Sequence, residues 1–162
     1  MLWLAILALG ALGLLAAART GRDLSSARVQ LRHVRRARFT PRPILNRAEF
    51  KRYAWLEAWA RGTPYRVFAQ VPYGEILACA DEDAFRSVNS KRADMLIVDA
   101  RGLPVVAVEY QGTGHWQGDA EDRDAVKRAA LASAGVPLVE LSPAHGRAEA
   151  VAMVEAALSG SF

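Results

Sequence analysis

The sequence predicts a small α/β domain that follows one apolar N-terminal helix. Two observations carry this expectation. The first 18 residues contain no charged side chain, and the rest of the chain alternates helical periodicity with short runs rich in β-branched and aromatic residues. With 162 residues, 52% of them hydrophobic, the chain can form one domain with a buried core plus an appendage. The single cysteine, Cys79, excludes a disulfide framework and argues against a cysteine-based zinc site.

Residues 1–18 are predicted to be a transmembrane anchor. At the rise of an α-helix they reach roughly 27 Å, close to the thickness of a bilayer's hydrocarbon core. The arginines that follow resist translocation, so the positive-inside rule places the C-terminal domain in the cytoplasm. The alternatives are a cleaved signal peptide, with its cleavage site near Ala16–Ala18, and a buried core helix.

Residues 19–42 are predicted to be a basic juxtamembrane linker, and residues 43–162 the folded domain. Between Arg19 and Arg47 there are nine arginines and one acid, whereas residues 48–162 contain 12 basic and 16 acidic side chains. The high pI therefore belongs to a short segment, which argues against a basic nucleic-acid binder as the class of the whole protein. The arginines either only fix the membrane topology or also contact anionic lipid headgroups or nucleic acid.

The folded domain is predicted to begin with a helix at residues 47–60. Asn46 and Glu49 have the spacing of a capping box, and Gly62 is a typical stop. The later elements expected from periodicity and turn residues are a strand at 65–71, a helix at 75–85, a β-hairpin of 93–98 and 103–110, a helix at 120–134, a strand at 136–141 and a closing helix at 147–158.

The candidate chemistry is concentrated in the predicted hairpin. If the chain turns about Arg101 and Gly102, Asp94 lies directly opposite Glu109, at the distance of about 4.5–5.5 Å that separates facing residues. Carboxylates this close repel each other unless a cation such as Mg²⁺, which takes oxygen ligands, lies between them. Strand alternation also places Gln111 on the side of Glu109. The alternative is that Asp94 caps the preceding turn and Glu109 pairs with an arginine.

The hairpin resembles a known superfamily. Asp94, followed fifteen residues later by Glu109-Tyr110-Gln111, resembles the D…ExK hairpin of PD-(D/E)XK nucleases, with glutamine in the lysine position. Residues 47–141 also resemble a bacterial family of unknown function, domain of unknown function 2726, which is itself similar to very-short-patch-repair-type endonucleases. The stretches that carry this resemblance are RAEFKRYAWLEA, YRVFAQV, KRADMLIVD, VVAVEYQGTGHW and DRDAVKRAALASAGVPLVEL.

The resemblance implies a restriction-endonuclease-like fold, with helices flanking a central mixed sheet, and hydrolysis of nucleic acid, with DNA as the expected partner. Asp94 and Glu109 would hold Mg²⁺ (or Mn²⁺) with the carbonyl of Tyr110. The metal would lower the pKa of a bound water and polarise the phosphate. Glu49 occupies the place of a first-helix acid that helps to bind metal in many of these nucleases, although the capping box already explains it.

The sequence departs from the nuclease pattern at the lysine. Gln111 cannot act as a base, but its amide can orient a water or bond a phosphate oxygen. Lys127 is the candidate replacement, because the helix after the hairpin packs near the site in such folds; the alternative is a solvated helix face with an ion pair to Asp124. The resemblance also implies that His115 protonates the leaving group or contacts the phosphate, with an exposed loop histidine as the alternative.

The sequence is compatible with two functions. The first is a Mg²⁺-dependent nuclease tethered to the bacterial inner membrane by a single pass, with its domain in the cytoplasm. The second is a catalytically inactive nuclease-fold module that binds nucleic acid or a protein partner. Asp94 and Glu109 favour the enzyme, whereas Gln111 and the acidic domain favour the module. The sequence contains no phosphate-binding glycine loop and no nucleophile elbow.

Overall fold

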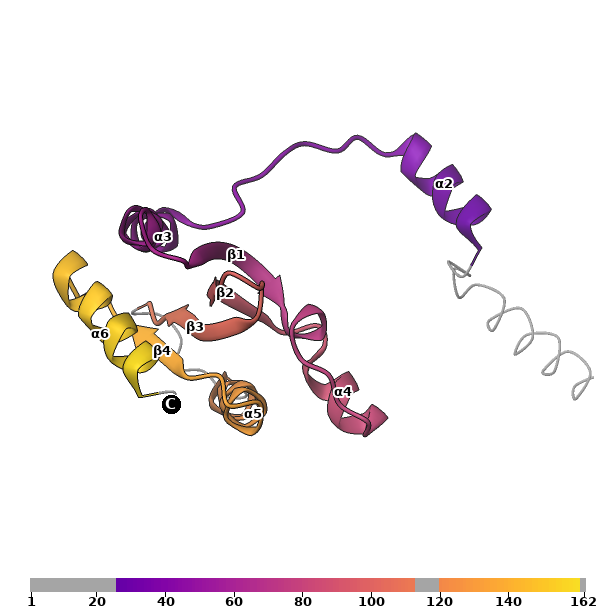
Figure 1. Ribbon diagram of the computed structural model, residues 1–162. Helices are drawn as coiled ribbons and strands as arrows, with labels where there is room; N and C mark the ends of the chain where they lie inside the picture. Colours follow the sequence, from indigo (N-terminus) through magenta and orange to yellow (C-terminus); the bar gives the residue numbers. More distant parts are fainter. Residues whose placement is uncertain (1–25, 113–119, 161–162) are drawn as a thin grey trace, which may run out of the picture. The chain divides into compact units, whose positions relative to one another are not determined.

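The chain divides into two units between Arg42 and Pro43. A computed structural model describes residues 26–112 and 120–160 (Figure 1). The first unit contributes α2 (Ala27–Arg36). The second contains, in chain order, α3 (Arg47–Ala60), β1 (Arg66–Pro72), the short 3₁₀ helix η1 (Tyr73–Glu75), α4 (Glu82–Val88), β2 (Arg92–Val98), β3 (Pro104–Tyr110), α5 (Ala120–Ser133), β4 (Leu138–Leu141) and α6 (Arg147–Ser159).

The predicted transmembrane anchor, residues 1–18, lies outside the described residues, as does the beginning of the basic linker. Within residues 26–112 and 120–160, no helix is both long enough and apolar enough to cross a membrane. The described part of the linker contains a helix that the sequence reading did not anticipate. This helix, α2, buries none of its residues. Its sequence therefore lacks the broad apolar stripe from which a core-facing helix is predicted.

The second unit is built on a four-stranded mixed sheet with the strand order β1-β2-β3-β4. β2 is antiparallel to both β1 and β3, and β4 pairs with β3 in parallel. The predicted hairpin of β2 and β3 is confirmed, with Met95 paired to Val108. Its turn closes through the bond from the Asp99 amide to the Leu103 carbonyl, 2.9 Å long, and Gly102 supplies the left-handed conformation at φ +83°.

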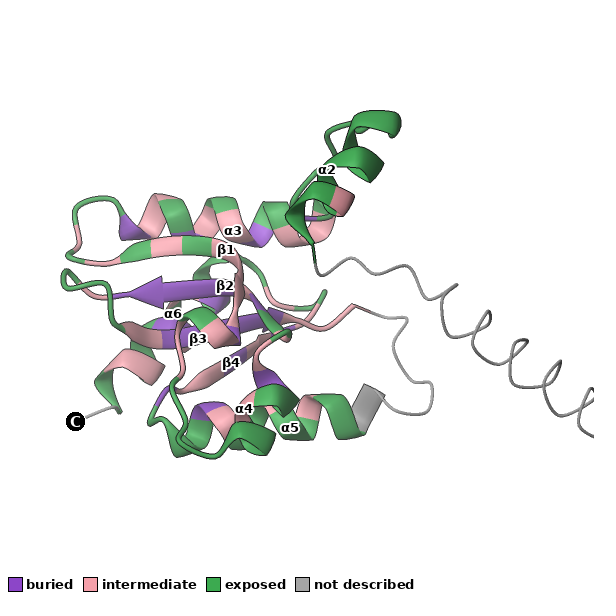
Figure 2. Cartoon of the chain, turned by 90° about the vertical axis from the view of Figure 1, so that its right-hand side faces the viewer, coloured by how far each residue is buried: buried purple, intermediate pink, exposed green. Residues whose placement is uncertain are grey.

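Each face of this sheet is covered by helices, which makes the unit a three-layer α/β structure. β2 and β3 are buried over most of their length (Figure 2). On one face, apolar residues of β2, β3 and β4 pack against α3 and α6; this cluster contains Leu56, Met95, Ile97, Val106, Val108, Val139, Leu141, Ala150 and Val154. On the other face they pack against η1, α4 and α5, in a cluster of Tyr73, Val88, Ala93, Leu96, Val98, Ala107, Leu131 and Val136.

Helix α3 begins where its capping box predicts. The Asn46 side chain accepts bonds from the amides of Ala48 and Glu49 at 2.8 and 2.9 Å, and Glu49 Oε2 accepts from the Asn46 amide at 2.8 Å. These contacts satisfy amides that have no partner inside the helix. The helix ends at Ala60, as predicted, and Leu56 is completely buried beneath it.

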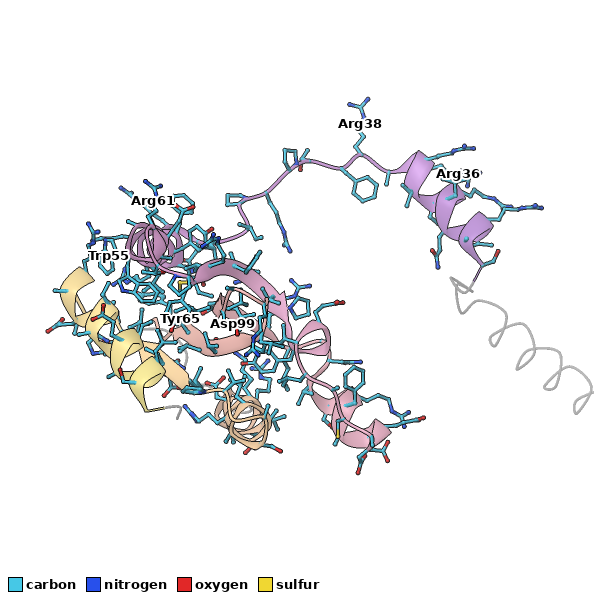
Figure 3. All side chains as sticks on the ribbon, viewed as in Figure 1. Arg36, Arg38, Trp55, Arg61, Tyr65 and Asp99 are labelled. Atoms are coloured by element: carbon cyan, nitrogen blue, oxygen red, sulfur yellow. The ribbon has the colours of Figure 1, made fainter. Side chains whose placement is uncertain are left out.

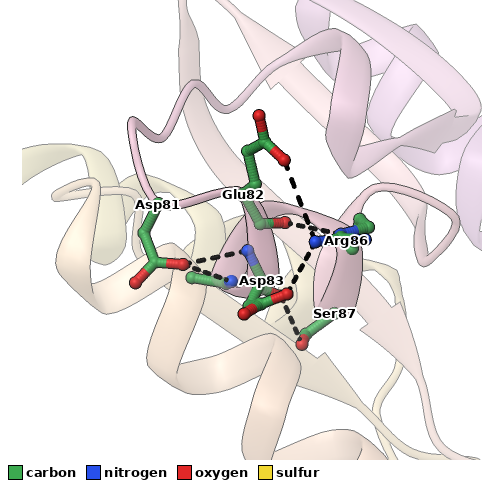
Figure 4. A network of polar contacts seen from close by, with 6 residues as sticks. Asp81, Glu82, Asp83, Arg86 and Ser87 are labelled. Carbon is green, nitrogen blue, oxygen red and sulfur yellow. Dashed lines mark hydrogen bonds and ion pairs between the residues drawn. The ribbon is translucent and has the colours of Figure 1, made fainter.

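The expected helix at residues 75–85 is wrong. The chain instead forms η1, continues without regular structure, and starts α4 at Glu82. The Asp81 carboxylate accepts bonds from the amides of Asp83 and Ala84 at 2.9 Å, so it sets a later helix start than the apolar residues suggested (Figure 4). Tyr73 is fully buried, and this tertiary contact holds η1 at the end of β1.

Candidate functional site

Polar side chains from the four strands form one row across the sheet, near the C-terminal end of β3. Flanking pairs in the β1–β2 register place Gln70 opposite Asp94, and the β2–β3 register places Asp94 opposite Glu109. Glu109 is in turn paired with Glu140 on β4. We call Gln70, Asp94, Glu109 and Glu140 the polar row. Neighbours in register share a face of the sheet, so the predicted meeting of Asp94 with Glu109 is what the register produces.

Asp94 is half-buried and is held by neutral donors. Its Oδ2 accepts a bond from the Tyr110 amide at 2.9 Å, and its Oδ1 accepts from Gln70 Nε2 at 3.3 Å. These donors lie across the sheet, so Asp94 does not act as a cap of the preceding turn. Gln70 has φ +55°, the one positive value among the described non-glycine residues, and its backbone is therefore strained next to a candidate ligand.

Glu109 is the buried acid of the row. Its side chain is 9% exposed, with Oε2 2.8 Å from Lys127 Nζ and Oε1 accepting from the Tyr73 hydroxyl at 3.4 Å. Burial, followed by the charge of Asp94, raises the pKa of Glu109 to about 7, although Lys127 opposes the change. Burial and Glu109 also raise the pKa of the Tyr73 hydroxyl. The ammonium group of Lys127 therefore does not fully offset the burial of Glu109 and its repulsion by Asp94.

Lys127 points into the site from α5. Its side chain is 20% exposed and forms an ion pair with Glu109, so the solvated helix face considered above is wrong. The ion pair of Lys127 in the structure is with Glu109, whereas the alternative considered above was an ion pair with Asp124. The structure thus places a cation beside Glu109, although β3 itself carries no lysine.

Gln111 is held by the far end of the polar row. Its Nε2 donates to Glu140 Oε1 at 3.3 Å, and the same oxygen is 2.7 Å from an amino group of Arg128. A carboxylate only accepts hydrogen bonds, so the Gln111 amide must turn its nitrogen toward Glu140. The carbonyl oxygen of Gln111 is then the amide atom left for other partners.

Glu49 lies in the pocket wall, but its carboxylate is engaged at the N-terminus of α3. In the described part of the chain, no group of three or more His, Cys, Asp or Glu side chains is placed to hold a metal ion. The capping box, which was the competing explanation for Glu49, is therefore what the structure shows. Predicted His115 lies outside the described residues.

A pocket of about 640 Å³ lies over this end of the sheet. Its lining combines opposite charges from β2, β3, α3, α5 and the loop before β2. The acidic members are Glu49, Asp94, Glu109 and Asp124, the basic members are Lys91, Arg92, Arg123 and Lys127, and Gln70, Ser90, Tyr110 and Gln111 complete the wall. The pocket has room for water and for a charged ligand beside the two adjacent acids.

The Arg52 side chain packs against Tyr110, a residue of the pocket wall. It is 7% exposed, and its guanidinium carbon lies 4.4 Å from the ring centre of Tyr110 and 5.2 Å from that of Trp55, which Figure 3 shows on α3. Its Nε has no hydrogen-bond partner in the described part of the chain. The contact with Tyr110 helps to fix the residue whose amide holds Asp94.

Sequence reasoning missed four residues of this arrangement: Gln70, Tyr73, Glu140 and Arg52. Gln70 and Glu140 could have been found only from the pairing of β1 and β4 with the hairpin, which their own sequences do not specify. Tyr73 and Arg52 have types that usually remain at least partly exposed, so their burial gives no local signal.

The site offers part of what a hard divalent cation requires. Asp94 and Glu109 supply carboxylate oxygens on one face of the sheet. Mg²⁺ is commonly held by one or two carboxylates and keeps several waters, for which the pocket has space. Burial, followed by the charge of Asp94, raises the pKa of Glu109, and a bound cation would stabilise the charged form of this acid. Asp94 and Glu109 could therefore supply two oxygen ligands to such an ion, with waters completing its coordination.

One family model and two bacterial relatives match this chain. Residues 41–157 match the family described as Protein of unknown function (DUF2726). An uncharacterized protein of Haemophilus influenzae is 42% identical over 115 residues, which cover 70% of this chain and 60% of that relative. Uncharacterized protein y4bI of Sinorhizobium fredii is 45% identical over 106 residues, or 64% of this chain and 76% of that relative. No solved structure gives a significant match.

Proposed function

The chain belongs to the DUF2726 family of proteins of unknown function, and we propose that it is a Mg²⁺-dependent nuclease-like protein that hydrolyses phosphodiester bonds of nucleic acid. One observation carries the proposal. Asp94 and Glu109 are adjacent across β2 and β3, and Lys127 Nζ lies 2.8 Å from Glu109 in a pocket of about 640 Å³. The two acids on one face of the sheet resemble the acidic pair of PD-(D/E)XK nucleases, and Lys127 on α5 would replace the lysine that β3 lacks.

The two acids of the polar row would bind the metal. Asp94 is kept in place by the Tyr110 amide and by Gln70, and Glu109 by Lys127 and Tyr73. Such contacts fix the direction of carboxylate oxygens before an ion arrives. Bound Mg²⁺ (or Mn²⁺) would lower the pKa of a water and would act as a Lewis acid that polarises the phosphate.

Lys127 and Gln111 would act on the water and the phosphate. Lys127 carries three donors and a charge next to Glu109, and can stabilise charge that develops on a phosphate oxygen. Gln111, with its nitrogen on Glu140, can accept a hydrogen bond from a water through its carbonyl oxygen. Lys91 and Arg92 in the pocket wall can contact backbone phosphates, with DNA as the expected substrate.

The three-layer arrangement supports a restriction-endonuclease-like fold for the second unit. Its hairpin of β2 and β3 carries the acids, a parallel strand β4 extends the sheet, and α5 delivers the lysine.

We place this domain on the cytoplasmic side of a bacterial inner membrane, with residues 1–18 as the tether. Protease added to the periplasmic side of spheroplasts should leave it intact; digestion there would contradict this orientation.

The alternative is a nuclease-fold module that binds nucleic acid or a protein without cleaving it. One observation favours it: Gln111 stands in place of the usual lysine and is bonded to Glu140. Glu49 also remains in the N-cap of α3 instead of joining the two acids. A module of this kind would keep the basic wall of the pocket and lose hydrolysis.

Metal binding is the first test. Titration of the full-length protein in detergent with Mg²⁺ or Mn²⁺ should release or absorb heat and saturate. Asp94→Asn and Glu109→Gln should each abolish that signal, whereas Glu75→Gln, at an exposed position on η1, should leave it unchanged. Equal affinity in the wild type and both site variants would rule out this metal site.

Cleavage is the second test. Single- and double-stranded DNA and RNA are incubated with metal and with each variant. Lys127→Met should lower the cleavage rate roughly 100-fold or more, in line with the loss of one preorganised charge. Arg86→Met is the control, because Arg86 is an exposed side chain on α4 that pairs with Glu82 and Asp83 outside the pocket. Metal and nucleic-acid binding without any cleavage would establish the module instead.

A further inference from the structure

Helix α2 gathers its arginines on one face. Arg28, Arg32 and Arg35 are three or four residues apart, and Arg36 directly follows Arg35. With Leu31 they surround a shallow hollow of about 320 Å³. Ala27, Leu31 and Val34 follow the same spacing on the adjoining face. The helix contains no acidic residue, so nothing within it neutralises the arginines.

The apolar face of α2 has no protein partner among the described residues. None of its residues is buried, and Leu31 and Val34 are 48% and 50% exposed. Phe39, three residues beyond the helix, is 74% exposed. A helix of ten residues gains too little from its own hydrogen bonds to be stable alone in water. Its stability therefore calls for a partner that is apolar on one side and anionic on the other.

We infer that α2 lies in the interface of an anionic lipid bilayer. The arginines would bind headgroup phosphates, while Leu31 and Val34 enter the boundary of the acyl chains. Long arginine stems suit this position, because they cover apolar surface while the guanidinium stays among the headgroups. Figure 3 shows Arg36 extended from the helix. The inference does not depend on hydrolysis by the second unit.

Two observations favour lipid over nucleic acid as the partner. A phosphate backbone would pair with the arginines but leave Leu31, Val34 and Phe39 in water. In addition, residues 1–18 contain no charged side chain, and only eight residues separate them from α2. A membrane that holds that apolar segment is within reach of the helix.

The test compares neutral and anionic membranes around the full-length protein. The protein is reconstituted in nanodiscs of phosphatidylcholine alone or with one third phosphatidylglycerol, and amide hydrogen exchange is followed over residues 27–36. Exchange should be at least tenfold slower in the anionic discs. Each arginine replaced by glutamine should lose roughly fivefold of that protection, in line with the effect of one basic residue near an anionic surface.

Exposed arginines of the second unit provide the matched control. Arg61→Gln, Arg86→Gln and Arg101→Gln together remove charge without touching α2, and should leave its exchange unchanged. Equal exchange in neutral and anionic discs would overturn the inference. So would protection that appears in neutral discs only when a short DNA duplex is added, which would assign the helix to nucleic acid.

A second measurement reports the orientation of α2. In a Cys79→Ser background, an environment-sensitive fluorophore is attached to Val34→Cys or to His33→Cys, which leave all four arginines in place. The Val34 label should shift to the blue in anionic discs, whereas the His33 label should remain close to its value in water. Identical spectra from both positions would contradict an interfacial helix with its apolar face inward.

Discussion

β2 and β3 contain two regions of opposite character. In the middle of the strands, Met95, Ile97, Val106 and Val108 are completely excluded from water. One step along, Asp94 faces Glu109, and the same hairpin places two carboxylates side by side. The apolar region stabilises the fold by burial, whereas the acidic region repels itself and raises the pKa of Glu109.

Stability and chemistry therefore come from separate parts of the same strands. The apolar middle fixes the register, and the register then holds together two groups that would otherwise move apart. Substitutions in the middle should therefore lower stability. Those in the polar row should have small or even favourable effects on stability while they remove ligand binding.

The largest effect is expected from the apolar middle. Ile97→Ala leaves a cavity beneath α3 and α6, and should lower the free energy of unfolding by about 2 to 5 kcal/mol in urea titrations. Exposed Phe68→Ala on β1 is the matched control and should change it by less than about 1 kcal/mol. Equal losses from both variants would remove the distinction between core and surface in this sheet.

Glu109→Gln should change how stability depends on pH. The folded-state pKa is about 7 against an ordinary 4.5, so the protonated acid favours folding below pH 4.5 and this contribution is lost as pH rises through 7. Relative to wild type, the variant should gain about 3 kcal/mol between pH 4 and pH 9. Urea titrations across this range measure it, with Glu75→Gln as the control; a difference independent of pH would contradict the burial of a destabilised carboxylate.

Lys127→Met should destabilise the protein at pH 8 by about 2 kcal/mol, because the buried Glu109 loses its ammonium partner and must either remain charged or take up a proton. At pH 5, where Glu109 is protonated, the loss should shrink. Arg128→Met breaks a more exposed pair with Glu140 and should cost at most about 1 kcal/mol at either pH. Thermal unfolding of the two variants at both pH values separates them, and equal losses would show that the Glu109 pair is an ordinary surface bridge.

The smallest effect is expected at Gln70. Gln70→Gly removes the strain of φ +55° and also a weak bond to Asp94, so its net gain in unfolding free energy should not exceed about 1 kcal/mol. Ala69→Gly, one residue earlier on β1, should instead cost about 1 kcal/mol. The two are compared in urea titrations, and a loss of the same size at both positions would exclude strain at Gln70.

Local patterns predicted most elements of the second unit. The capping box predicted the start of α3, and two apolar runs separated by a turn with Gly102 predicted the hairpin of β2 and β3. The approach of Asp94 to Glu109 followed from that register. The helix expected at 75–85 failed, because Asp81 sets a local start and Tyr73 is drawn into the core by residues far away in sequence.

Turn chemistry and strand alternation act over neighbouring residues, so local sequence was enough to predict the hairpin and its two opposed acids. The other side chains of the site are brought together by packing between elements. Lys127 reaches Glu109 because α5 packs on that face of the sheet, and Gln70 and Glu140 join the row because β1 and β4 flank the hairpin. Contacts between distant segments depend on how whole elements pack, and no local pattern records them.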